Sequence, residues 1–203
     1  QIGSHHNVEL DENLVRHMVL NSLRGYRNRF SKDYGELVIC CDDKNYWRKK
    51  IFPYYKEWMT VTCEDTFIKN AVFVNIYDDS YTNDDLLGIA ANNFSKKFNN
   101  VRDESKEYFP YKVIQIETCE ADDIIATVVH DIEGSQLLNG SEMIMILSGD
   151  KDFIQLHQYE NVVQYDPVRK RWIKHNNPEE YLKEHIAKGD RGDGVPNILS
   201  KDD

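Results

Sequence analysis

Apolar residues recur every three or four positions along several stretches of the chain, which is the spacing of an amphipathic helix. The first stretch begins at Asp11, a residue type that caps helices well. Pro178 stands in the first turn of the last stretch, where proline is well tolerated. The predicted helices cover residues 11–30, 47–58 with a bend or restart at Pro53, 86–108, 120–133 and 178–188, with a further short helix from Phe153.

Short apolar runs between these helices predict β-strands. Residues 37–41 and 143–147 are continuously apolar, as in strands covered on both faces of a parallel sheet, whereas residues 111–116 alternate. Two shorter strands are expected at residues 162–165 and 171–174. Strands that alternate with helices predict an α/β fold with a mainly parallel central sheet and helices on both faces. In such sheets the ligand site lies beyond the carboxyl ends of the strands.

Length and composition limit the class of protein. With 203 residues and 40% hydrophobic content, the chain can bury one substantial core, which favours a single domain. No apolar run approaches the roughly 18 residues of a membrane span, so we expect a soluble, cytoplasmic protein with no membrane partner. We also expect a monomer. The absence of a CxxC pair predicts reduced, buried thiols at Cys40, Cys41, Cys63 and Cys119.

The formal net charge of −10 argues at first against nucleic acid as a partner, because acidic surface repels a polyanion. The acidic residues are gathered, however. Three predicted strands run directly into carboxylates and a closing glycine-rich turn holds two more, in the order Asp42, then Glu120, Asp122 and Asp123, then Asp150 and Asp152, then Asp190 and Asp193. Folding would bring them into one crevice, where they need positive ions among them.

Oxygen ligands without histidine or cysteine favour hard ions, Mg²⁺ or Mn²⁺. Two such ions about 4 Å apart can activate a water molecule and stabilise the leaving oxygen in phosphodiester hydrolysis. Each aspartate alone could be only a cap or turn residue, but that explanation requires three strands to end in acids by coincidence. Surface or capping roles are expected for the histidines, which form no ligand pattern: His5, His6, His17, His130, His157, His175 and His185.

Four motifs resemble those of the 5′-nuclease or flap endonuclease superfamily, and within it the ribonuclease H group of T-even phages. They are Cys-Cys-Asp, Tyr-Trp-Arg and Tyr-Lys within residues 40–56, Glu-Ala-Asp-Asp at 120–123, Ser-Gly-Asp-Lys-Asp-Phe at 148–153 and Gly-Asp-Arg-Gly-Asp-Gly-Val-Pro at 189–196. The resemblance implies a PIN-like fold and a 5′–3′ exonuclease or flap endonuclease with two Mg²⁺ ions, or Mn²⁺ in their place. A phage-encoded member would act in the host cytoplasm.

The resemblance also implies roles for individual residues. The first metal ion would lie among Asp42, Glu120, Asp122, Asp123 and Asp150, and the second among Asp152, Asp190 and Asp193. Arg48 and Lys56 match the basic residues that grip the scissile phosphate and the 5′ strand, and Lys49 is a further expected DNA contact. The residues implied in catalysis are Asp42, Arg48, Lys56, Asp123 and Asp150. For the basic residues, the alternative is a solvated helix face.

The closing turn resembles the start of a helix–turn–helix, where backbone amides and K⁺ meet duplex phosphates. Its implied contacts are Gly189, Gly192, Gly194 and Val195. Residues 1–186 would form the catalytic domain and residues 187–203 the beginning of the DNA-binding region. The implied substrates are DNA and RNA–DNA duplexes with 5′ ends or flaps, as in primer removal, and replication proteins are further candidate partners.

Two features depart from the family pattern. The first ligand aspartate of the family lies on a strand before the residues that Gln1 resembles, so we expect weak or no nuclease activity from these 203 residues alone. Residues 57–85 occupy the place of a basic arch, yet they carry Asp78, Asp79, Asp84 and Asp85 against Lys69. An acidic arch would repel a nucleic acid strand, so this stretch is either a divergent lid with another role or not part of the native reading frame.

Two other functions fit parts of the pattern. A phosphatase could use Asp42 as nucleophile beside one Mg²⁺ ion, and it would act on small phosphomonoesters but not on DNA. A scaffold that has lost catalysis could bind branched nucleic acid, and its binding would not respond to chelators. The order of the acidic motifs favours the nuclease.

Overall fold

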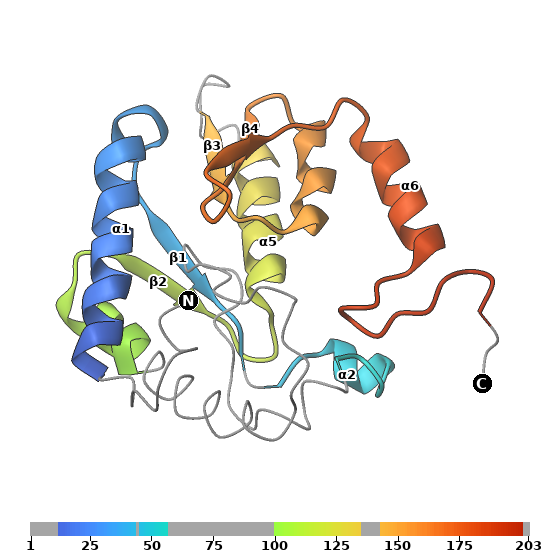
Figure 1. The fold of residues 1–203 in the computed structure, drawn as a ribbon, viewed down its shortest axis with the longest axis horizontal. Coiled ribbons are helices and arrows are strands. Elements are labelled where there is room, and N and C mark those ends of the chain that lie inside the picture. The colour runs from blue at the N-terminus through green and yellow to red at the C-terminus, as the bar shows by residue number, and fades with distance from the viewer. Residues whose placement is uncertain (1–11, 44, 57–99, 135–142, 201–203) are drawn as a thin grey trace, which may run out of the picture.

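Short strands enclosed by helices make up the fold (Figure 1). The structure, a computed structural model, describes residues 12–43, 45–56, 100–134 and 143–200. Residues 100–108 are helical. The other elements, in chain order, are α1 (Glu12–Tyr34), β1 (Val38–Cys41), α2 (Arg48–Ile51), β2 (Lys112–Gln115), α5 (Ala121–Gly134), β3 (Ile144–Leu147), the 3₁₀ helix η1 (Lys151–Gln158), β4 (Val162–Asp166), β5 (Arg171–Ile173) and α6 (Pro178–Lys188).

Helix α1 buries one face along its length. It extends past the predicted end to Tyr34, and Gly35 follows with a positive φ of 78°, a conformation that glycine adopts without strain and that commonly ends helices. Neither α1 nor any other helix in the described ranges is long and apolar enough to cross a membrane. The buried residues fall at helical spacing: Val15, Val19, Leu23 and Phe30.

The strands form two small sheets, and the same helices pack against both sheets. β1 pairs with β2 in parallel, and β3 pairs in parallel with β4, whose other edge carries the antiparallel β5. Ile39 and Cys41 of β1 pack in the cluster that contains α1, and so does Leu147 of β3. Cys40 and Ile146, which alternate with them, pack with residues of α5. Helices therefore cover both faces of the strands, which confirms the predicted α/β class.

Within the described residues, the hydrophobic pattern locates the five strands and α6, but it predicts α2 to be too long. The helix predicted over residues 47–58 ends at Ile51. Phe52 is extended, with ψ of 95°, because the residue before a proline is sterically disfavoured in the helical region. Residues 53–56 form turns instead. The acidic residues 57–85 lie outside the described ranges, as do residues 86–99 of the next predicted helix.

The cysteine prediction holds for the two thiols of β1. Burial raises the pKa of Cys40 to about 12 and that of Cys41 to about 11, so both remain protonated near neutral pH. Cys119 is only half-buried, because it lies in the loop before α5, and Cys63 lies outside the described ranges.

Leu23 tests the packing of α1, because its side chain is fully buried. Leu23→Ala should lower the free energy of unfolding by about 2–5 kcal/mol, through lost apolar burial and the cavity left behind. Met18→Ala on the same helix should change it by about 0.5 kcal/mol or less, since Met18 is 41% exposed. Urea denaturation followed by circular dichroism measures both, and equal losses would contradict this packing.

Candidate metal centre

Glu120 lies just before α5 with only 2% of its surface exposed, and side chains from residues 48–56 surround it. Lys56 Nζ donates to its Oε1 at 2.6 Å, while Arg48 Nη1 and the Tyr55 hydroxyl each donate to its Oε2 at 2.9 Å. A buried carboxylate is stable only when opposite charge and hydrogen bonds replace its hydration. These contacts therefore fix residues 48–56 against the start of α5.

The Arg48 guanidinium holds Asp123 with two parallel hydrogen bonds, of 2.8 Å to Oδ2 and 2.7 Å to Oδ1. The Trp47 indole N–H also donates to Oδ2 at 3.1 Å, and Arg48 lies 4.6 Å from the indole centroid. Burial favours the neutral acid, but hydrogen bonds from Arg48 and the Glu120 backbone outweigh it and lower the pKa of Asp123. Both oxygens of Asp123 are thus engaged by donors of the protein.

The glycine-rich turn after α6 docks on the same residues. Lys56 Nζ lies 3.4 Å from Asp193 Oδ1, and the Tyr55 hydroxyl lies 3.2 Å from its Oδ2. The Lys56 N–H donates to the Asp193 carbonyl oxygen at 3.0 Å. Gly194 has a φ of 74°, and a side chain there would meet the Tyr54 carbonyl oxygen at 3.1 Å. Both facts favour glycine at this position, so the turn can bring Asp193 close to Lys56.

A second group of acids forms where β1 and β3 end. Asp42 is 3% exposed and accepts the Ala121 N–H at 2.7 Å, at the N-terminus of α5, where the helix dipole favours negative charge. Burial and the negative charges of Asp150 and Asp42 raise the pKa of Asp122 well above its ordinary value. The charges of Asp42 and Asp150 therefore both act on Asp122, which links the three carboxylates electrostatically.

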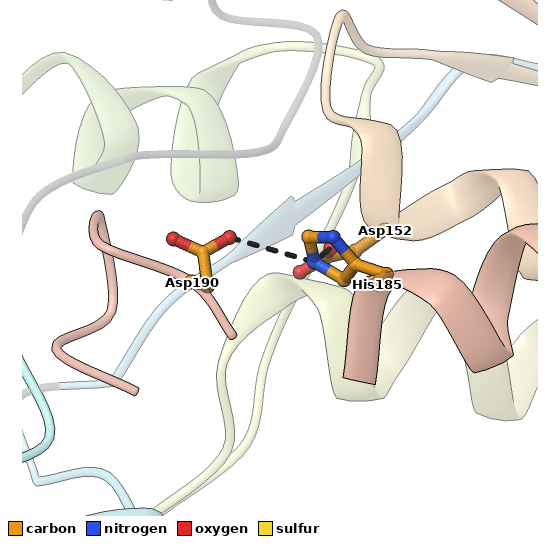
Figure 2. Close-up of side chains that lie close together, drawn as sticks. All are labelled: Asp152, His185 and Asp190. Atoms are coloured by element: carbon orange, nitrogen blue, oxygen red, sulfur yellow. Dashed lines mark ion pairs between the residues drawn. The ribbon is translucent and has the colours of Figure 1, made fainter. Parts of the chain in front are cut away.

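Asp152 and His185 extend this acidic group towards α6. Asp150 caps η1 by accepting the Asp152 N–H at 3.1 Å. Burial and the charge of Asp150 raise the pKa of Asp152 to about 6. His185 Nε2 lies 3.1 Å from Asp152 Oδ1 and 3.5 Å from Asp190 Oδ2, as Figure 2 shows. Ligand atoms of Asp152, His185 and Asp190 all lie within 4.8 Å of one another.

Asp190 owes its position to the closed turn that follows α6. Its backbone exchanges two hydrogen bonds with Val195, and its Oδ1 accepts the Asp193 N–H at 3.1 Å. Gly189, with φ of 68°, begins the turn, and a side chain there would lie 2.5 Å from the Pro196 carbonyl oxygen. The glycine is therefore required for the chain to reverse and place Asp190 beside α6.

The structure brings the predicted carboxylates together in two groups, and the charges of one group affect those of the other. Their members are Glu120, Asp123 and Asp193 around Lys56, and Asp42, Asp122, Asp150, Asp152 and Asp190 at the strand ends and α6. The solvated-face alternative is wrong for Lys56, which is 4% exposed, and for Arg48, which is held by two acids. Lys49 lies over the Tyr46 ring, 5.3 Å from its centroid.

The expectation of a surface or capping role for His185 did not include its contacts with Asp152 and Asp190. The residue lies in the site because α6 packs against η1, an arrangement that no local pattern encodes. One signal was available, since His185 precedes the Asp190 motif by little more than one helical turn.

The donor set fits divalent cations. Carboxylate oxygens predominate, which suits hard ions such as Mg²⁺ and Mn²⁺. The raised pKa values of Asp122 and Asp152 indicate that protein cations do not fully balance the charge on this side of the site. A bound cation would relieve that repulsion.

Comparison with known proteins identifies a family and relatives of this chain. Residues 11–187 match the family model of the 5′–3′ exonuclease N-terminal resolvase-like domain. The chain is 31% identical over 202 residues to the ribonuclease H of Enterobacteria phage T4. That match covers 96% of the chain and 57% of the relative, so the chain spans a little over half the length of the phage T4 protein.

Solved structures from bacteriophage T5 share the fold. A T5 flap endonuclease in a complex with DNA and metal ions matches with a TM-score of 0.67 and 15% identity, over 95% of this chain and 64% of that one. A structure of the T5 protein co-crystallised with metal ions matches with a TM-score of 0.66 and 15% identity, over 92% of this chain and 64% of that one.

Lys56→Met should lower the free energy of unfolding of the metal-free chain by about 3–5 kcal/mol, because Glu120 would remain buried without its closest cation. The double change Lys56→Met with Glu120→Gln should recover part of that loss. Lys50→Met, on an exposed side chain nearby, serves as the control and should change stability by about 0.5 kcal/mol or less. Urea denaturation in EDTA measures these differences, and similar losses for the two lysines would refute the proposed importance of the pair.

Asp122→Asn should stabilise the metal-free chain near neutral pH, because burial and acidic neighbours penalise the charged form of Asp122. A carboxyl with a raised pKa stabilises the fold at low pH and loses that contribution as the pH rises through the raised value. The advantage of the variant should therefore shrink on acidification. Urea denaturation in EDTA at several pH values tests this, with Asp131→Asn on the exposed side of α5 as control. A loss of stability near neutral pH would contradict the crowding.

Proposed function

The chain belongs to the family of 5′–3′ exonuclease N-terminal resolvase-like domains, and from this premise we propose that it is the catalytic part of a divalent-metal-dependent 5′ nuclease. The enzyme would hydrolyse phosphodiester bonds at the 5′ ends or flaps of DNA and RNA–DNA duplexes. The main support is the crowding of Asp42, Asp122 and Asp150, in which the pKa of Asp122 is raised by burial and by its acidic neighbours. Such a group stabilises bound cations.

Two Mg²⁺ ions are proposed, with Mn²⁺ able to replace them. Bound to this site, the ions would activate the attacking water and stabilise the leaving oxygen. The first ion would be held by Asp42, Asp122 and Asp150, with Glu120 and Asp123 beside them, and the second by Asp152, Asp190 and Asp193. Both carboxylate oxygens of Asp123 accept hydrogen bonds from Arg48. The role proposed for Asp123 is therefore to orient Arg48 before the substrate binds.

Arg48 and Lys56 are proposed to act on the phosphate in different ways. Arg48 keeps 28% of its side chain exposed, and its planar fork matches two phosphate oxygens, so direct contact is feasible. Lys56 is 5% exposed at its side chain and lies between Glu120 and Asp193, so its main contribution is a fixed positive charge. Lys49, partly exposed on α2, would contact the 5′ strand.

The substrate class rests on the relatives and on the turn after α6. The phage T4 relative is named a ribonuclease H, and the phage T5 flap endonuclease binds DNA, which supports RNA primers and DNA flaps as substrates here. The turn would present backbone groups of Gly189, Gly192, Gly194 and Val195 to the duplex, together with K⁺. We place this activity in a monomer in the cytoplasm of a phage-infected host, with replication proteins as further partners.

The test of this function is cleavage of a 5′-labelled DNA flap. A chain extended at its N-terminus by the aspartate-bearing strand of the family should cleave the flap in Mg²⁺ and lose activity in EDTA. Asp150→Ala should reduce the rate by about a hundredfold or more, because it removes a proposed ligand of the first ion.

Asp131→Ala, on the exposed side of α5, is the matched control and should leave the cleavage rate unchanged. Flap binding without cleavage by the extended chain, insensitive to EDTA, would instead favour a scaffold that has lost catalysis. Hydrolysis of small phosphomonoesters with no action on DNA would favour a phosphatase.

A further inference from the structure

His185 introduces a nitrogen atom into a site otherwise built from carboxylates. Its Nε2 lies within 3.1 Å of Asp152 Oδ1 and 3.5 Å of Asp190 Oδ2, and the three side chains converge from η1, α6 and the turn after α6 (Figure 2). One atom from each residue lies within 4.8 Å of the others, a spacing that allows all three to bind one ion. The convergence therefore has the geometry of a mixed nitrogen–oxygen site.

The imidazole is held in this orientation by its surroundings. The Tyr181 ring, one turn earlier on α6, stacks on it at 5.8 Å between centroids, with 12° between the ring planes. α6 itself packs against η1, the element that carries Asp152. Preorganised ligands bind metal ions better than mobile ones, because less side-chain freedom is lost on binding.

Asp190 is also held in place. Its Oδ1 accepts the Asp193 N–H at 3.1 Å, while its Oδ2 faces His185. The carboxylate is thus oriented by backbone on one oxygen and presents the other towards the imidazole nitrogen. A partner of this kind fixes the direction of a metal ligand.

We infer that His185 is a direct ligand of the divalent cation bound by Asp152 and Asp190, and that it gives this site a preference for transition-metal ions such as Mn²⁺ over Mg²⁺. The inference rests on the proposed function. It gives the second metal ion a nitrogen ligand in addition to its oxygen ligands. Imidazole binds first-row transition metals well, whereas Mg²⁺ strongly prefers oxygen. The ligand set expected from the sequence contained only carboxylates, so the nitrogen changes which ion the site selects.

Pulsed electron paramagnetic resonance of Mn²⁺ bound to the 203-residue chain tests direct ligation. The wild-type spectrum should show coupling to a directly bound imidazole nitrogen, which changes when the histidines carry ¹⁵N. His185→Gln should remove this coupling and weaken Mn²⁺ binding about ten- to hundredfold, the range found when groups supporting a metal site are removed. Mg²⁺ affinity, measured by competition, should fall less.

Two controls separate ligation from other effects. His130→Gln removes a histidine that contacts the Tyr159 hydroxyl away from the site, and it should leave both the coupling and the affinity unchanged. Asp190→Asn should weaken binding of the same ion and reduce the nitrogen signal at a fixed Mn²⁺ concentration. Urea denaturation in EDTA confirms that each variant is folded.

The outcomes distinguish this inference from the proposed function. Mn²⁺ bound without nitrogen coupling would overturn ligation by His185 and leave the nuclease proposal intact, even if His185→Gln lowered the affinity. Nitrogen coupling that persists in His185→Gln would also overturn it. A wild-type chain that binds no Mn²⁺ would overturn ligation by His185, whereas nitrogen coupling in a chain whose extended form fails to cleave DNA would overturn only the nuclease.

Discussion

The burial of Glu120 is the constraint on which the rest of the site depends. A carboxylate withdrawn from water is stable only beside positive charge, and Glu120 obtains it from Arg48 and Lys56. Lys56 in turn contacts Asp193, near the other end of the described chain. One electrostatic requirement thus joins residues 48–56, the start of α5 and the turn after α6. Segments that are distant in the sequence are held in a single arrangement by the charges that they must neutralise.

The same charges divide the site into two chemically different sides. Arg48 and Lys56 lie among Glu120, Asp123 and Asp193, and the pKa of Asp123 is accordingly lowered. On the other side the neighbours of Asp122 include further acids and its pKa is raised. The first side, where two cations lie beside three acids, is closer to charge balance than the second, which favours bound cations. The net charge of −10 does not exclude an anionic substrate, because cations bound on the acidic side would cancel much of it locally.

The parts of the fold that the sequence predicts are those set by local pattern. The strands are short apolar runs between polar boundaries, and α6 begins at a proline in its first turn, so neighbouring residues suffice to locate them. The gathering of Asp42, Glu120 and Asp150 follows from one topological rule, since each comes after a strand, whereas Asp190 and Asp193 come after α6. The burial of Lys56 and the place of His185 depend on contacts between elements, with α5 and with η1 respectively, and no local pattern carries that information. Helix α2 ends earlier than the spacing of apolar residues predicts, because the residue before a proline disfavours helical backbone.

Backbone N–H groups orient several of the acids without any cation or substrate. A backbone donor fixes a carboxylate without adding a formal charge, so repulsion among the acids remains and favours a bound cation. Asp123 differs, because the charged guanidinium of Arg48 takes both of its oxygens and lowers its pKa. Aspartates in adjoining motifs therefore have different roles. Whether the hydrogen-bond donor carries a charge decides which role each aspartate has. The acids that accept a backbone N–H and lie on the cation-favouring side are Asp42, Asp150 and Asp190.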